Sequence, residues 1–146
     1  MARLAIQTIH LDLSPERVVV RADGQINTYQ PVLHLLVSEN SGWRRAVLGS
    51  MSMALGGDPL TVQPAYSVAL FSGGAELPPG LSKADCLERF FRLAFKRLMV
   101  GYVFRTKPRV EVHGLARLEP ALAGYQEGLL REALKTAGAG AVHIVD

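Results

Sequence analysis

Apolar and polar residues alternate along short segments in the first third of the chain, which is the period-two pattern of β-strands. The alternating segment 3–13 ends at a Ser-Pro pair, where proline removes a backbone hydrogen-bond donor. The β-branched segment 17–22 follows and ends in the turn-forming residues Ala-Asp-Gly. Segments 32–37 and 43–49 then flank a short polar loop. The pattern therefore predicts three or four antiparallel strands at the start of the chain.

The second half of the chain changes to a helical period, with apolar residues three and four positions apart. This spacing predicts a long helix over about 83–103, with Ser82 and Asp85 placed as a capping box at its start. A second amphipathic pattern begins near Leu122 and ends at Gly138. Both segments are therefore expected to be helices with one apolar face turned toward a core.

Short strands predicted at 109–113 and 141–145 alternate with these helices, an order typical of right-handed parallel crossovers. Segment 50–81 is rich in glycine and proline and predicts an irregular insert with at most one short strand, at 66–71. Residues 1–146 are thus expected to form a single α/β domain. Its mixed sheet has three antiparallel and then two parallel strands, with two crossover helices. This is the ribonuclease H-like architecture, which actins share.

The order and spacing of these segments resemble the N-terminal half of the bacterial actins that determine rod shape, the MreB family. IHLDL, followed by VVV, a proline and RRAVLG, resembles the opening hairpin and third strand of that family. LSKADCLERFFRLAFKRL is similar to its first helix, KPRVEVHG to the next strand, and REALKTAGAGAVHIVD to the helix and strand that follow. The resemblance implies an actin-like fold and a setting in the bacterial cytoskeleton or cell-shape machinery. A complete actin would continue beyond Asp146 with a second half.

The turn after the first strand departs from this family. Bacterial actins carry an Asp-x-Gly-Thr loop there, which holds phosphate. Here Asp12 is followed by Leu-Ser-Pro-Glu-Arg, so glycine is missing, proline deletes an amide donor and Glu16 adds negative charge. The resemblance with this departure implies a truncated, non-catalytic actin-like protein that neither binds nor hydrolyses ATP. Such a protein needs no catalytic residues, cofactor or metal and acts as a scaffold or accessory subunit.

An enzymatic alternative stays open, because nucleases and resolvases of the same fold hold two metal ions on clustered carboxylates. The candidates for such a cluster are Asp12, Asp85 or Glu88, and Glu111. Asp85 and Glu88 also suit the start of a helix, where they offset its dipole. Residual ATP binding is the other enzymatic alternative.

The alternation within each strand sorts its residues onto two faces of the sheet. One face is continuously apolar and is expected to meet the helices: Val18, Val20, Leu33, Leu35, Val37, Val110, Val112, Val142 and Ile144. The other face mixes His10, Asp12, His34, Glu111, His113 and His143 with Leu4, Ile6, Val19, Leu36 and Val145. All four histidines fall on the mixed face.

The resemblance implies that a complete actin half covers this mixed face with a further helix. We therefore expect another protein surface there, most simply a second copy across a two-fold axis. A full-length actin-like protein or a separate second half is the alternative partner, and the insert folding back would instead give a monomer. A histidine-lined metal site is the sharper alternative. The predicted interface residues are His10, His34, Glu111, His113 and His143.

Composition narrows the picture further. The 146 residues carry a net charge of +3 with lysine and arginine scattered, which argues against a nucleic-acid partner. A single cysteine, Cys86, excludes an intramolecular disulfide and fits a cytoplasmic protein. No apolar stretch reaches the length of a membrane span.

Overall fold

A computed structural model describes residues 5–36, 52–60, 63–64, 66–71, 77, 80–102, 107–118 and 123–145. Within these residues the elements follow the order β1 (Thr8–Leu13), β2 (Val18–Ala22), β3 (Gln25–Leu36), β4 (Ser52–Gly56), β5 (Tyr66–Ala69), α1 (Lys83–Leu98), β6 (Arg109–His113), the 3-10 turn η2 (Leu115–Arg117), α2 (Ala123–Ala137) and β7 (Ala141–Ile144).

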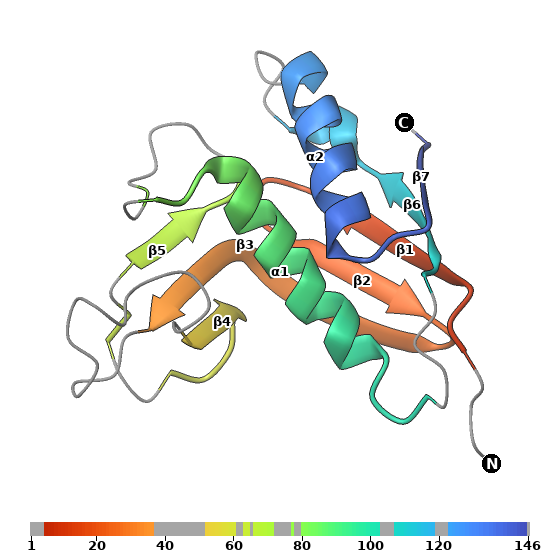
Figure 1. The fold of residues 1–146 in the computed structure, drawn as a ribbon, viewed down its shortest axis with the longest axis horizontal. Helices are drawn as coiled ribbons and strands as arrows, with labels where there is room; N and C mark the ends of the chain where they lie inside the picture. The colour runs from red at the N-terminus through yellow and green to blue at the C-terminus, as the bar shows by residue number, and fades with distance from the viewer. Residues whose placement is uncertain are drawn as a thin grey trace.

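The strands form one mixed sheet in the order β4-β3-β2-β1-β6-β7, with β5 also paired to β3. β1, β2 and β3 pair antiparallel, whereas β1 with β6 and β6 with β7 pair parallel. Helix α1 leads into β6, and α2 connects β6 to β7; both helices cross the same face of the sheet (Figure 1). The structure therefore confirms the predicted ribonuclease H-like arrangement of three antiparallel and two parallel strands.

The core lies between this face and the helices, as the alternation predicts. Ile9, Leu11 and Leu13 of β1 are fully buried, while the residues between them are partly exposed. They belong to one core cluster with Phe90 and Phe91, which are also fully buried on α1. Burial of each such side chain stabilises the fold by roughly 1.5–3 kcal/mol relative to leaving it exposed.

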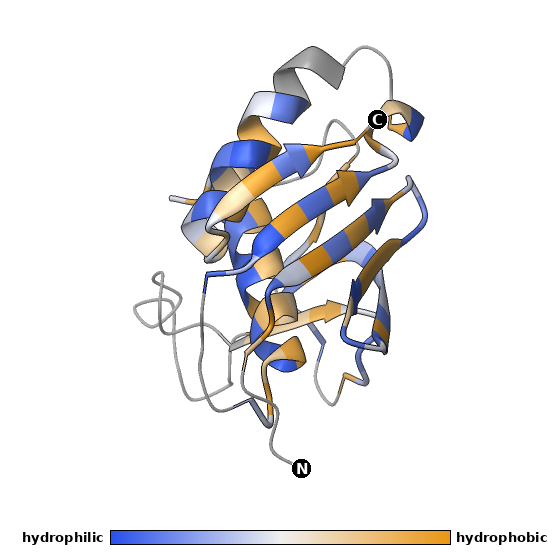
Figure 2. Cartoon of the chain, turned by 90° about the vertical axis from the view of Figure 1, so that its right-hand side faces the viewer, coloured by the Kyte–Doolittle hydropathy of each residue, from blue (hydrophilic) through white to orange (hydrophobic). Residues whose placement is uncertain are grey.

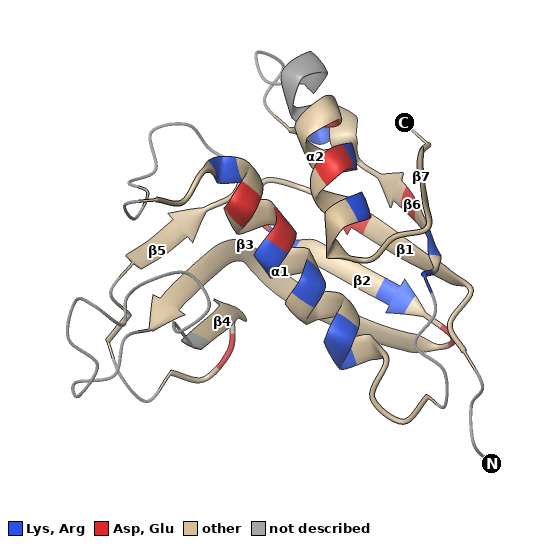
Figure 3. Cartoon of the chain, viewed as in Figure 1, with Lys and Arg blue, Asp and Glu red and all other residues tan. Residues whose placement is uncertain are grey.

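Helix α1 begins where the sequence predicts and ends earlier. The Ser82 Oγ accepts a hydrogen bond from the Asp85 backbone N–H at 3.2 Å, and the Asp85 carboxylate accepts one from the Ser82 N–H at 2.9 Å. In Figure 3 the acidic positions of α1 lie in its N-terminal half, and basic positions occur along the helix up to its C-terminal end. Asp85 in the first turn and Lys96 and Arg97 in the last turn complement the helix dipole. The helix ends at Leu98 instead of 103, because Gly101 adopts a left-handed φ of 90°.

The strand predicted to start at residue 32 starts earlier in the structure, at Gln25, as β3. It runs for 12 residues straight through Pro31. Pairing with β2 ends at Tyr29, pairing with β5 begins at Val32, and the register with β4 shifts in between. Pro31 is tolerated because its missing N–H falls at this irregularity.

The insert is more regular than predicted, because it contributes β4 as well as β5. The strand predicted at 43–49 lies outside the described residues.

Asp58 joins the segment after β4 to helix α1. Its carboxylate accepts two hydrogen bonds from the Arg97 guanidinium, at 2.9 and 2.7 Å, and one from the Leu55 N–H at 2.8 Å. The Arg97 guanidinium lowers the pKa of the Asp58 carboxyl below its ordinary value. Arg97 also lies over the Tyr29 ring at 5.7 Å, so the contact reaches β3 as well.

Gly114 is held by a close approach between the ends of β1 and β6. Its φ is 87°, and a Cβ placed on it would lie 2.2 Å from the Leu13 carbonyl oxygen. Gly101 has nearly the same φ, 90°, but a Cβ there would meet no atom of the described residues within 4 Å. A side chain at Gly101 would therefore meet only the cost of the left-handed conformation, whereas one at Gly114 would also clash with the Leu13 backbone.

Replacing Asp58 by asparagine is expected to destabilise the protein at neutral pH by about 1 kcal/mol, since the charged pair is lost. Because the pKa of Asp58 is lowered by folding, its contribution is fully present above the ordinary carboxyl value and is lost as pH falls from that value through the lower value of the folded state. Thermal unfolding from pH 7 down to pH 3 checks this: the Asp58→Asn midpoint should lie about 2–4 °C lower at pH 7 and converge with the wild type in acid. The control is Glu127→Gln, which removes an exposed ion pair with Arg131. Equal losses in the two variants would contradict the role of Asp58.

Alanine at Gly114 and at Gly101 should have different costs. Gly101→Ala is expected to cost about 1–2 kcal/mol for the left-handed conformation, and Gly114→Ala a further 1–3 kcal/mol, roughly, for overpacking against Leu13. Urea unfolding curves of both variants give the comparison. Equal destabilisation would show that the β1 and β6 ends do not approach each other as described.

Candidate functional site

The face of the sheet opposite the helices carries the alternate residues of β1, β2, β6 and β7. In Figure 2 the helices lie to the left of the sheet, and each strand alternates between hydrophilic and hydrophobic residues. The register aligns these residues in rows that cross the strands: Arg21 pairs with His10, His10 with Glu111, and Glu111 with His143. In the next row, Asp12 pairs with His113. The mixed face of the sequence analysis is thus a real surface built on four strands.

Three of the predicted interface residues form one cluster on this face. The His10 Nδ1 lies 3.1 Å from the Glu111 Oε2, and the rings of His10 and His113 are 6.1 Å apart between centroids. One donor atom from each of His10, Glu111 and His113 lies within 4.8 Å of the others. Parallel pairing of β1 with β6 places His10 beside Glu111, and the two-residue step along β6 places His113 on the same face.

Charged residues surround this cluster on the same strands. The Arg109 guanidinium lies 3.4 Å from the Glu111 Oε1, so Glu111 meets Arg109 and His10 with different oxygens. His143 lies on the other side of Glu111 in the row and is exposed. The Glu111 side chain remains 24% exposed, so the cluster is open to solvent.

His34 lies apart from the other predicted interface residues. It is on the second half of β3, paired with β4 and β5, and its Nδ1 lies 2.8 Å from the Ser67 Oγ. One strand, β2, lies between β3 and β1 in the sheet order, and β2 pairs with the first half of β3, not with the half that carries His34. The prediction of one continuous histidine surface is therefore only partly met.

The loop after β1 is closed on itself. The Ser14 N–H donates to the Arg17 carbonyl at 2.9 Å, and the Ser14 Oγ accepts from the Arg17 N–H at 3.1 Å. The Asp12 carboxylate pairs with the Arg117 guanidinium at 3.1 Å. A phosphate-binding loop would present such groups to the anion. Here the Ser14 amide, the Ser14 hydroxyl and the Asp12 carboxylate each have a partner within the chain.

The carboxylates considered for a nuclease site do not come together. Asp12 and Glu111 lie on the open face of the sheet, whereas Asp85 and Glu88 lie on α1, across the core. Asp85 belongs to the helix cap, and Glu88 forms an ion pair with Arg92.

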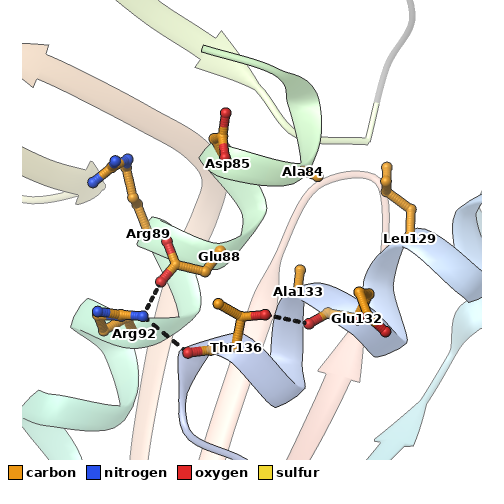
Figure 4. A pocket seen from close by; sticks show the side chains of 9 residues that line it. All are labelled: Ala84, Asp85, Glu88, Arg89, Arg92, Leu129, Glu132, Ala133 and Thr136. Atoms are coloured by element: carbon orange, nitrogen blue, oxygen red, sulfur yellow. Dashed lines mark hydrogen bonds and ion pairs between the residues drawn. The ribbon is translucent and has the colours of Figure 1, made fainter. Parts of the chain in front are cut away.

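A groove of about 400 Å³ separates α1 from α2, and Glu88 and Arg92 line it (Figure 4). The Arg92 guanidinium also donates to the Thr136 carbonyl at 2.9 Å, and the Thr136 hydroxyl donates to the Glu132 carbonyl at 3.0 Å. The Arg92–Thr136 hydrogen bond joins the two helices across the groove, whereas the Thr136–Glu132 hydrogen bond lies within α2.

Apolar residues complete the open face. Ile26 is 66% exposed and follows Arg21 in the row, and Val145 is 48% exposed beyond His143. Val19 and Leu36 are partly buried, as expected of mixed positions. The alternation places Ile6 on this face, but the structure places it in the core, outside the regular part of β1, which begins at Thr8. Leu4 lies outside the described residues.

Sequence reasoning did not single out Arg109 or Arg117, which pair with the two carboxylates of this face. Arg109 could have been found from the alternation of β6, since it lies two residues before Glu111. Arg117 follows the strand in η2, and its pairing with Asp12 spans 105 residues, so no local pattern marks it.

Cys86 is fully buried on α1, and burial raises the pKa of its thiol. Neither described helix has the length and apolarity needed to cross a membrane.

The fold defines the class of protein as a ribonuclease H-like α/β domain. No family model matches the chain, and no curated protein matches it. Among solved structures, the crystal structure of MreB5 of Spiroplasma citri bound to ADP is similar, with 12% sequence identity and a TM-score of 0.46. The match covers 95% of this chain and 37% of that chain. It identifies neither a family nor an activity for this protein.

Proposed function

We propose that the protein is a nucleotide-independent, actin-like scaffold or accessory subunit that associates with a second copy of itself through the open face of its sheet. The observation that carries the proposal is the combination of exposed apolar and charged residues on that face. Ile26 and Val145 lie at its two ends, and the ionic row of Arg21, His10 and Glu111 lies between them. Apolar residues exposed next to a polar centre are typical of surfaces that bind proteins.

The charge order on the face favours a second copy as the partner. Arg21, His10 and Glu111 follow one another across three neighbouring strands. A two-fold axis parallel to β1 and passing over His10 reverses the strand order in the partner. Arg21 of each copy would then lie opposite Glu111 of the partner subunit, so that opposite charges meet twice.

The loop after β1 supports independence from nucleotide. Phosphate-binding loops present free backbone amides to the anion, and glycine allows the backbone to approach it. In this chain the Ser14 amide and hydroxyl are bonded to Arg17, and Asp12 is paired with Arg117. The sequence segments that resemble rod-shape-determining actins support a place in the bacterial cytoskeleton or cell-shape machinery.

Light scattering behind a sizing column tests the proposal. The wild type is expected at twice the mass of one chain, with or without ATP and magnesium. Ile26→Glu should shift it to the monomer, because a charge would be buried against an apolar surface. Val100→Glu is the matched control, since Val100 is 73% exposed and follows α1 on the helix side.

Two results would contradict the proposal. A wild type that stays monomeric at high concentration would contradict the proposed self-association. Assembly only in the presence of ATP would contradict the proposed independence from nucleotide. If Ile26→Glu and Val100→Glu changed the mass equally, the interface would not lie on the open face.

A further inference from the structure

We propose that His10, Glu111 and His113 form a binding site for a divalent first-row transition-metal ion, with Zn²⁺ as the representative. Two imidazoles and one carboxylate are a donor set that such ions prefer, whereas Mg²⁺ and Ca²⁺ prefer oxygen alone. This inference does not require the self-association proposed above, because all three residues belong to one chain.

The distances suit a metal ion. The donor atoms of the three side chains lie within 4.8 Å of one another. Ligands at about 2.1 Å from a tetrahedral zinc ion lie about 3.4 Å from each other. The His10 Nδ1 and the Glu111 Oε2 are already 3.1 Å apart. The His113 donor atom lies within 4.8 Å of both, so we expect the three side chains to close around one ion by side-chain adjustment.

The backbone holds the three side chains in place before a metal binds. His10 and Glu111 are register partners on neighbouring strands in the middle of the sheet, and His113 is two residues along β6. Below them, Ile9, Leu11 and Val112 are fully buried in the core. Ligands fixed on a packed sheet lose little conformational freedom on binding.

The surroundings leave one oxygen of Glu111 for the ion. Arg109 meets the Oε1, and Oε2 points to His10. A cation that holds one oxygen of a ligating carboxylate fixes its orientation, in the manner of an outer-shell partner. In the next row, Arg117 pairs with Asp12. The set is thus two histidines and one glutamate, and the remaining coordination positions face solvent.

Isothermal titration of Zn²⁺ into the untagged full chain tests the site. We expect one ion bound per chain, and no saturable binding of Mg²⁺. His10→Gln, Glu111→Gln and His113→Gln should each weaken binding at least about 10-fold, the lower range for disturbing a metal site. His34→Gln is the matched control, because His34 is a half-buried histidine elsewhere on the sheet, and its affinity should equal that of the wild type.

A measurement on the wild type keeps the test independent of whether the variants fold. One equivalent of Zn²⁺ should shift the assigned NMR signals of the His10 and His113 rings and leave those of His34 unchanged. Absence of saturable binding, or equal shifts at His34, would overturn the site. A monomer that binds one Zn²⁺ would contradict the proposed self-association alone. Because the proposed dimer covers His10 and Glu111, the metal site is also tested in the Ile26→Glu variant, and a monomeric variant that binds no Zn²⁺ would contradict the metal site alone.

Discussion

The parallel pairing of β1 with β6 is the contact on which the rest of the structure depends. β1 is the strand where the antiparallel half of the sheet meets the parallel half. Its alternation turns Ile9, Leu11 and Leu13 into the core and His10 and Asp12 to the open face. A shift of one residue in this pairing would reverse both sets. The core and the candidate site are therefore two consequences of one register.

The fold was largely predictable because its signals are local. Ser82 and Asp85 mark the start of α1 by a cap that forms as predicted, and alternation separates the two faces of the strands. The errors have local causes too. The helical pattern predicts that α1 continues past Gly101 to 103, although that glycine is left-handed. The alternation predicts a strand that starts at residue 32, after Pro31, whereas β3 runs through this proline and changes its pairing partners there. Strand β4 was missed because its glycine-rich surroundings favour loops.

The candidate site was predictable only in part, because its contacts connect distant residues. Alternation places His10, Glu111 and His113 on one face, but it does not say which of them meet. Their proximity requires the observed register of β1 against β6. Registers that differ by two residues keep every side chain on its face but change which side chains are neighbours. His34 shows the same limit, since it shares the alternation yet is bonded to Ser67 on another part of the sheet.

The two carboxylates of the open face have different partners, and this difference decides what the face can bind. Asp12 is paired with Arg117, which neutralises its charge. Glu111 shares its oxygens between Arg109 and His10, so a histidine nitrogen already lies where a second ligand is needed. The donor atoms of this face, two imidazoles and a carboxylate, are therefore of the kind that suits ions accepting nitrogen ligands.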